Sequence, residues 1–256
     1  MNNRIMKWVW INSSKIGTSH LNSEHPKNQD AHFVYLTQNN ILISAIADGA
    51  GSTTFGGYGA WITCRIIKNF FIKWYSSKTY HPSEDTVRIL INDIRYQLLK
   101  TAQKRKTEFR NFASTLSVVL ASKEETVFFS IGDSPIVAKS NNIWGVTTCP
   151  DVGEYASTTF FTTEKNFPRM QFIRSKTIFS AFALMSDGVG KISINERNLS
   201  PSSKFFQPIL DQTKKSSTIG KNKLLSNQLG AFLESKRVSS KTEDDKTLIF
   251  IGKSYE

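Results

Sequence analysis

The chain has 256 residues and carries 33 Lys and Arg against 21 Asp and Glu, which gives a formal net charge of +12. A hydrophobic fraction of 39%, with 18 Phe, supplies enough apolar surface for a sizeable core, so disordered, collagen, coiled-coil and disulfide-scaffold classes are excluded. The positive charge favours an anionic partner, such as nucleic acid, an acidic membrane surface or a phosphorylated substrate, without choosing among them.

Hydrophobic periodicity predicts a chain in which helices lie between groups of strands. In chain order, the expected elements are strands 7–11, 31–37 and 41–47, helices 61–74 and 87–102, strands 112–121, 126–131, 136–139 and 178–185, helices 205–210 and 224–233, and strand 247–252. Ser83, followed by Glu84 and Asp85, is suited to cap the second helix. The pattern favours an α+β fold with mainly antiparallel sheets. No linker or repeat divides the chain, so residues 1–256 are expected to form one domain.

Residues 141–175 have the weakest pattern of the chain. Gly, Pro, Thr and Phe are mixed there without a period. Segments of this kind are often irregular insertions that cover a site. We therefore expect an irregular, flap-like segment at about 141–175.

Cysteine content and hydropathy favour a cytoplasmic protein without a membrane span. Cys64 and Cys149 are far apart and form no CxxC motif, so neither a disulfide framework nor a zinc knuckle can be built from them. The longest apolar run, 41–47, is much shorter than the roughly 20 residues of a membrane-spanning helix. The N-terminus lacks the continuous apolar region of a secretory signal.

Several carboxylates lie at the ends of apolar strands in a chain that has few carboxylates. They are Asp48 in ADGAGS, Asp133 in IGDS, Asp187 in MSDGVG, and Asp244 with Asp245 in TEDDKT. One Asp-Gly pair alone is more often a turn than a ligand site. Four such sites, with Asp30 in NQD as a fifth, favour converging ligands. Oxygen ligands without paired His or Cys indicate Mg²⁺ or Mn²⁺, and two such ions can clamp a phosphoryl group around a bridging water.

The order and spacing of these motifs resemble the metal-dependent protein phosphatase 2C family, the PPM-type serine/threonine phosphatases, and especially its divergent bacterial members. The resemblance covers nearly the whole chain. It rests on segments 28–30 (NQD), 47–52 (ADGAGS), 113–116 (ASTL), 131–134 (IGDS), 186–189 (SDGV) and 244–247 (DDKT). It implies a four-layer αββα sandwich, in which two central antiparallel β-sheets are flanked by helices and the metal ions lie at one edge of the sheets.

The resemblance also implies which residues hold the metal ions. Asp48 would bridge two Mn²⁺ or Mg²⁺ ions, and the Gly49 carbonyl would complete one of the two sites. Asp187 and Asp244 would hold the other ion. Asp133 matches the carboxylate that binds a weaker third ion in bacterial members.

Asp30 and His20 are the expected catalytic residues. Asp30 matches an acidic position that acts through metal-bound water. Many relatives carry a phosphate-binding Arg before this motif, and segment 17–21 (GTSHL) lacks it. His20 is the best substitute, as a donor to phosphate or a general acid, because an imidazole pKa of about 6.5 suits proton transfer near neutrality. A loop histidine without a role is the equally weighted alternative; His25 is a weaker candidate, and Asp245 stands where relatives usually have Asn.

The resemblance implies hydrolysis of phosphoserine or phosphothreonine in a protein substrate by direct attack of a metal-activated water, without a phosphoenzyme. A cognate Ser/Thr kinase is the expected signalling partner. Two alternatives stay open: a catalytically silent phosphatase fold that serves as a binding or regulatory module, and a nucleic-acid-binding protein suggested by the charge of +12. The presence of Asp48, Asp187 and Asp244 weighs against the first, and the lack of a recognised nucleic-acid motif weighs against the second.

Overall fold

The computed structural model describes residues 6–21, 27–148, 150, 159–195 and 197–255. These residues form two compact units, each built from segments that are far apart in the sequence. One unit draws on Met1–Asn28, Pro135–Cys149 and Lys176–Glu256, and we name it the Asp187 unit. The other draws on Gln29–Ser134 and Pro150–Ser175, and we name it the Asp48 unit. That residues 1–256 form one domain stays a prediction.

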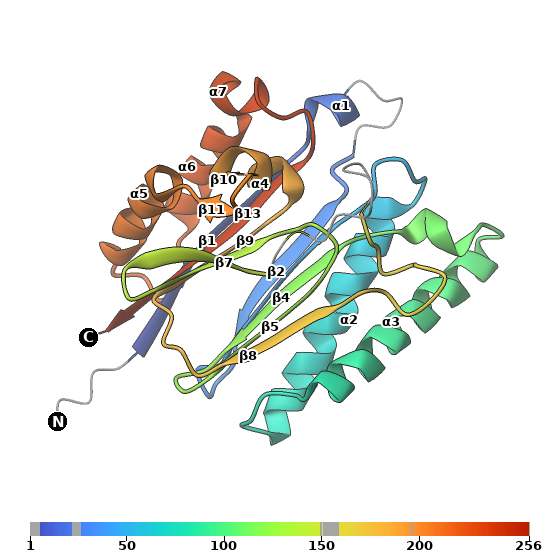
Figure 1. Cartoon of the computed structure of the whole chain (residues 1–256), viewed down its shortest axis with the longest axis horizontal. Coiled ribbons are helices and arrows are strands. Elements are labelled where there is room, and N and C mark those ends of the chain that lie inside the picture. Colours follow the sequence, from blue (N-terminus) through green and yellow to red (C-terminus); the bar gives the residue numbers. More distant parts are fainter. Residues whose placement is uncertain (1–5, 22–26, 149, 151–158, 196, 256) are drawn as a thin grey trace. The chain divides into compact units, whose positions relative to one another are not determined.

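The Asp48 unit is a five-stranded antiparallel sheet covered by two long helices (Figure 1). Its strands, in spatial order, are β2 (Asp30–Leu36), β3 (Leu42–Asp48), β4 (Leu116–Ala121), β5 (Thr126–Ile131) and β8 (Gln171–Ser175). The helices α2 (Gly56–Ser77) and α3 (Glu84–Lys104) lie side by side along this sheet, and the short 3-10 helix η1 (Phe109–Phe112) follows them. The predicted strands and helices of this region are thus largely confirmed.

Apolar side chains that alternate along the strands pack against apolar side chains at helical spacing on α2 and α3, and together they form one core. Ile43 and Ala45 of β3 lie two residues apart, and both belong to the buried cluster that the helices cover. Phe71 and Ile94 meet this cluster from α2 and α3. The predicted N-cap is confirmed, because the Thr86 N–H donates to Ser83 Oγ at 3.3 Å.

The Asp187 unit is a six-stranded sheet with helices packed on it. In spatial order its strands are β12 (Gly220–Lys221), β1 (Met6–Lys15), β13 (Lys246–Tyr255), β9 (Ala181–Met185), β6 (Ile136–Ser140) and β7 (Ile143–Thr148). The remaining elements are α1 (Thr18–Leu21), α4 (Asp187–Ser193), the ribbon β10 (Ile194–Asn195) and β11 (Ser200–Pro201), α5 (Ser203–Lys214), α6 (Lys223–Glu234) and α7 (Lys236–Ser239). Phe206 of α5 and Leu233 of α6 pack with Phe250 of β13 in the core. Neighbouring described strands are antiparallel except β1 and β12, so the α+β class is confirmed.

Residues 141–175 are more regular than expected. They contain β7, which pairs with β6, and β8, which pairs with β5. Each is the last strand of its sheet, and only a part of its side chains is buried, so the apolar alternation that reveals a strand in sequence is weak. The prediction of an irregular segment was therefore wrong for these two stretches, while residues 149 and 151–158 lie outside the described residues.

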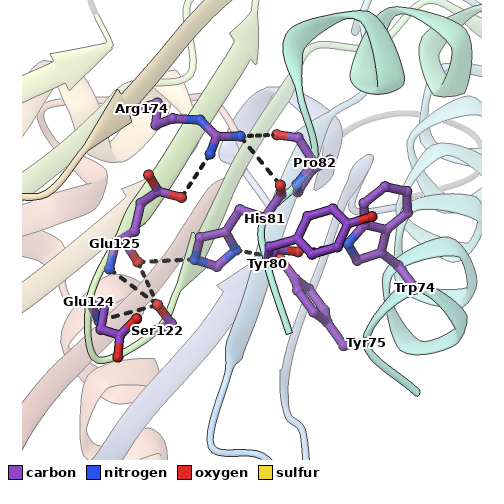
Figure 2. A network of polar contacts seen from close by, with 9 residues as sticks. All are labelled: Trp74, Tyr75, Tyr80, His81, Pro82, Ser122, Glu124, Glu125 and Arg174. Carbon is purple, nitrogen blue, oxygen red and sulfur yellow. Dashed lines mark hydrogen bonds and ion pairs between the residues drawn. The ribbon is translucent and has the colours of Figure 1, made fainter. Parts of the chain in front are cut away.

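A buried histidine between α2 and α3 contacts α2 and the β4–β5 turn in the Asp48 unit (Figure 2). His81 is 3% exposed; its Nδ1 accepts from the Tyr75 hydroxyl at 2.5 Å, and its Nε2–H donates to the Glu125 carbonyl at 3.0 Å. Arg174 of β8 donates to the Glu125 carboxylate at 2.9 Å and to the Pro82 carbonyl at 2.6 Å. The network thus holds an uncharged imidazole between a hydroxyl donor and a carbonyl acceptor.

We expect His81 to make stability fall in mild acid. Burial is the main cause that lowers the pKa of His81 below its ordinary value. The unfolded chain then binds the proton more readily, so the free energy of unfolding decreases as pH falls below about 6.5, by at most about 1.4 kcal/mol per pH unit from this group. Urea denaturation between pH 8 and about 5 should give a shallower pH dependence for His81→Gln than for wild type. Parallel pH profiles of the two proteins would contradict this role.

Candidate active site

Asp30 and Asp48 lie opposite each other at the ends of paired strands. Asp30 begins β2, Asp48 ends β3, and the two residues are register partners in the antiparallel pair. The Asp48 N–H donates to Thr115 Oγ1 at 3.0 Å, and the Thr115 N–H donates to the Asp48 carbonyl at 2.8 Å. Two backbone-directed bonds therefore fix the position of Asp48 relative to the chain around Thr115.

The donor chemistry of this pair fits a hard cation. Like charges directly opposite each other in a sheet are destabilising, and a cation between them removes the repulsion. Carboxylate oxygens are the ligands that Mg²⁺ and Mn²⁺ prefer. Asp48 thus has the donor chemistry that the predicted metal centre requires, and Asp30 lies opposite it in the sheet.

Gly49 lies where the backbone is too crowded for a side chain. Its N–H donates to the Gln29 carbonyl at 3.2 Å. A Cβ on Gly49 would lie 2.4 Å from the backbone carbon of Gly56 and 2.7 Å from the Gln29 carbonyl oxygen. Glycine therefore lets the chain after Asp48 turn against the start of α2.

The residue after Asp133 is linked to the backbone of Asp48 through two hydroxyl groups. Thr115 Oγ1 accepts from the Asp48 N–H and lies 2.8 Å from Ser134 Oγ. The Thr159 hydroxyl donates to Asp133 Oδ2 at 2.5 Å. Asp133 therefore lies shortly after the end of β5 and precedes a residue whose hydroxyl contacts Thr115, the residue that holds the backbone of Asp48.

Asp187 and Asp244 are brought together in the Asp187 unit by the start of α4. The Ser186 hydroxyl donates to the Asp245 carbonyl at 3.3 Å and accepts from the Thr247 N–H at 2.9 Å. A Cβ on Gly188 would lie 2.3 Å from the Asp245 carbonyl oxygen and 3.3 Å from Asp244 Cβ. This close backbone approach places the first turn of α4 directly against the residues that precede β13.

A lysine lies between these two carboxylates. Lys191 Nζ is 2.9 Å from Asp187 Oδ2 and 2.5 Å from Asp244 Oδ2. Partial burial lowers the pKa of Lys191, but the hydrogen bonds that its ammonium donates to Asp187 and Asp244 outweigh this effect and raise the pKa above its usual value. The ammonium thus neutralises part of the negative charge of the predicted ligand pair.

His20 lies beside a buried carboxylate. Asp245 is 3% exposed and accepts the Gly17 N–H at 2.6 Å. Its Oδ1 also lies 3.0 Å from His20 Nδ1. His20 belongs to the short helix α1, and His25 lies outside the described residues. Asp245 therefore orients both the turn at Gly17 and the imidazole of His20.

The predicted site residues divide between the two units. Asp30, Asp48, Gly49 and Asp133 belong to the Asp48 unit, and His20, Asp187 and Asp244 belong to the Asp187 unit. Among the residues that the structure describes, neither unit contains a group of three His, Cys, Asp or Glu side chains that could hold a metal ion. Each unit instead supplies one pair of carboxylates, Asp30 with Asp48 and Asp187 with Asp244.

Two residues with a clear place in the site were missed in the sequence. Thr115 belongs to the motif ASTL at 113–116, but its contact with the backbone of Asp48 depends on strand pairing. Lys191 lies four residues after Asp187, a spacing that indicates an ion pair once 187–193 is assigned to a helix. The glycines at 188 and 190 favoured a turn instead.

Comparison with known proteins agrees with this arrangement of motifs. Serine/threonine-protein phosphatase 3 of Escherichia coli K12 is 29% identical over 248 residues, which are 95% of this chain and 97% of the relative. The crystal structure of the serine/threonine phosphatase Stp1 from Staphylococcus aureus matches with a TM-score of 0.66 at 18% identity, over 95% of this chain and 94% of that one. The catalytic domain of the serine/threonine protein phosphatase PstP, solved in complex with 2 manganese ions, matches with a TM-score of 0.64 at 11% identity, over 97% and 99%.

The family assignment rests on the sequence match. The family model described as protein phosphatase 2C matches residues 16–234, a range that includes described segments of both units. The structural likenesses, at 18% and 11% identity, show the shared fold. The chain therefore belongs to the protein phosphatase 2C family of serine/threonine phosphatases.

Proposed function

We propose that this protein is a metal-dependent phosphatase that hydrolyses phosphoserine and phosphothreonine in proteins. The observation that carries the proposal is the pairing of carboxylates, Asp30 with Asp48 and Asp187 with Asp244, in a chain of the protein phosphatase 2C family. The relative with 29% identity is itself named a serine/threonine-protein phosphatase, which supports the same substrate class.

The residues proposed to hold the ions are those that match the ligand positions of the family. Asp48 would bridge two ions, the Gly49 carbonyl would complete one site, and Asp187 with Asp244 would complete the other. Asp133 would hold a weaker third ion. When bound, Mn²⁺ or Mg²⁺ would activate a water molecule for direct attack on phosphorus and stabilise the charge that develops on the phosphoryl oxygens. The oxygen-only donor set supports these metals.

Asp30 and His20 would act on protons and on the substrate phosphate. Asp30 lies beside Asp48 and can accept a hydrogen bond from water at that end of the sheet. His20 is oriented by Asp245, so that its ring has a defined direction from which to donate to the phosphate or to the leaving group. In this proposal, Asp30 positions the water molecule and His20 stabilises the leaving oxygen or the phosphate.

The one cysteine with a described environment does not support a thiol nucleophile. Burial, followed by the negative charge of Asp30, raises the pKa of the Cys64 thiol well above its ordinary value. The thiolate is the nucleophilic form of cysteine. Cys64 is therefore held as an unreactive thiol, which supports direct attack by water rather than a cysteinyl-phosphate route.

The proposed partners follow from charge and family. A net charge of +12 favours approach of a phosphorylated protein, which carries added negative charge. A cognate Ser/Thr kinase would supply this substrate. No helix in the described parts of the chain has both the length and the apolar character of a membrane span. A cytoplasmic location stays a prediction.

The proposed function is tested by hydrolysis of a phosphothreonine peptide by the purified full chain. We expect phosphate release with Mn²⁺ or Mg²⁺, and its loss on removal of metal with EDTA. Adding back the metal should restore turnover. A protein that is folded yet inactive with both metals would instead support the catalytically silent binding module.

His20→Ala tests the proposed role of the histidine. We expect kcat/KM for the peptide to fall by roughly 10²-fold, the usual contribution of general acid–base catalysis. Mn²⁺ affinity, measured by calorimetry, should stay unchanged, because His20 contacts Asp245 and is not among the proposed ligands. Wild-type kinetics in this variant would leave His20 without a catalytic role.

A further inference from the structure

Lys191 occupies the space between two carboxylates that the proposed function assigns to metal binding. Its Nζ is 2.9 Å from Asp187 and 2.5 Å from Asp244, and in both residues the contacting atom is Oδ2. One ammonium thus binds one oxygen of each proposed ligand. A divalent ion held by the same two oxygens would need the position that the ammonium now takes.

The backbone determines this arrangement, not the ion pair alone. Lys191 follows Asp187 by four residues in α4, so both side chains project from the same face of the helix. Asp244 is kept beside α4 by the close approach of Gly188 to Asp245 and by the Ser186–Thr247 hydrogen bonds. The two carboxylates therefore remain neighbours when Lys191 is replaced.

Charge and distance make the two cations mutually exclusive. Mg²⁺ binds oxygen at about 2.0–2.1 Å, and an ammonium within hydrogen-bonding distance of the same oxygens would repel it strongly. The Lys191 side chain is 43% exposed and ends a flexible four-carbon stem, so the ammonium can leave for water when an ion enters. Binding of the ion at this pair thus requires breaking two ion pairs.

We propose that Lys191 is a built-in competitor of the divalent cation at Asp187 and Asp244. Its ammonium neutralises part of their charge in the metal-free protein and weakens ion binding there. Ion occupancy of this pair then depends on the concentration of free divalent cation. The inference rests on the proposed function, because it takes Asp187 and Asp244 as metal ligands.

Mn²⁺ titration by calorimetry on the full-length protein tests the competition. Lys191→Met keeps the length of the side chain and removes its charge, and we expect it to bind Mn²⁺ about tenfold more tightly than wild type. Lys191→Arg keeps the positive charge and should retain the weak affinity. Lys223→Met, at an exposed position of α6, is the matched control for loss of one positive charge and should behave as wild type.

Thermal unfolding gives a second measurement that does not depend on activity. Without metal, Lys191→Met should unfold at a lower temperature than wild type, because Asp187 and Asp244 lose their counter-ion. Saturating Mn²⁺ should raise its Tm by more than it raises that of wild type, since tighter binding to the folded state adds more stability. Lys191→Gln is the substitute variant if the Met variant does not fold.

Two outcomes of the Mn²⁺ titration would contradict the proposal, and they can be told apart. Equal Mn²⁺ affinity of wild type and Lys191→Met would overturn the competition and leave the metal centre standing. Absence of Mn²⁺ binding in both proteins would overturn the metal centre and the competition together.

Discussion

Asp48→Asn is expected to lower phosphothreonine-peptide turnover by roughly a thousandfold or more, because one change removes the charge that is proposed to bridge both ions. The fold should survive. The Asp48 backbone keeps its bonds to Thr115 Oγ1 and from the Thr115 N–H, which do not involve the replaced side chain. Steady-state kinetics at several Mn²⁺ concentrations, together with circular dichroism, measures both parts of the prediction.

Stability supplies an independent check on this variant. In metal-free buffer, Asp48→Asn should be as stable as wild type or more stable, by up to about 1 kcal/mol, because the repulsion between Asp48 and its register partner Asp30 is gone. Mn²⁺ should raise the Tm of wild type and have less effect on the variant. Asp93→Asn, on an exposed position of α3, is the matched control and should leave turnover unchanged. Substantial turnover by Asp48→Asn would refute the ligand assignment.

Gly188→Ala is expected to disrupt the other proposed ligand pair through the backbone. The added Cβ would lie 2.3 Å from the Asp245 carbonyl oxygen, and a backbone atom cannot rotate away as a side chain can. The start of α4 must move, which shifts Asp187 away from Asp244. We expect the free energy of unfolding to fall by about 1–3 kcal/mol, typical of overpacking. Turnover should fall by roughly 10²-fold, since misplacement of a reacting group by about 1 Å has effects of this size.

Gly145→Ala is the control for Gly188→Ala, because it shows whether replacing a glycine by alanine lowers stability and turnover even where the added Cβ has room. A Cβ on Gly145 of β7 would meet nothing within 4 Å, so its stability and turnover should match those of wild type. Urea denaturation and peptide kinetics on both variants are the measurements. If Gly188→Ala retained wild-type kinetics and stability, the close approach to Asp245 would not be what keeps Asp187 beside Asp244.

Most regular elements could be predicted because their hydrophobic period is strong. The core side of α3 repeats at helical spacing and is buried, as at Val87, Leu90 and Ile94. Three of the elements that escaped prediction did so for different reasons. The edge strands β7 and β8 have too little burial for clear alternation, whereas α4 is short and contains two glycines.

The boundary before β4 was also predicted wrongly. Phe112 was assigned to a strand because it begins an apolar run, yet it ends η1, and β4 begins at Leu116. Phe112 is fully buried in the same cluster as the helices α2 and α3. Apolar character alone could not separate a buried 3-10 helix from a strand, because both bury their side chains.

Local composition predicted the family, and with it the proposed chemistry of the candidate site. Asp at strand ends beside Gly, in an ordered set of motifs, pointed to hard cations and to the protein phosphatase 2C family, and the match over residues 16–234 confirms the family. The contacts between residues of the candidate site that are far apart in the sequence could be seen only in the folded chain. Lys191 meets Asp244 across 53 residues, and Asp245 meets Gly17 across 228. Motif and period are properties of short stretches, whereas an ammonium between two carboxylates depends on how β9, α4 and β13 are brought together by long-range pairing.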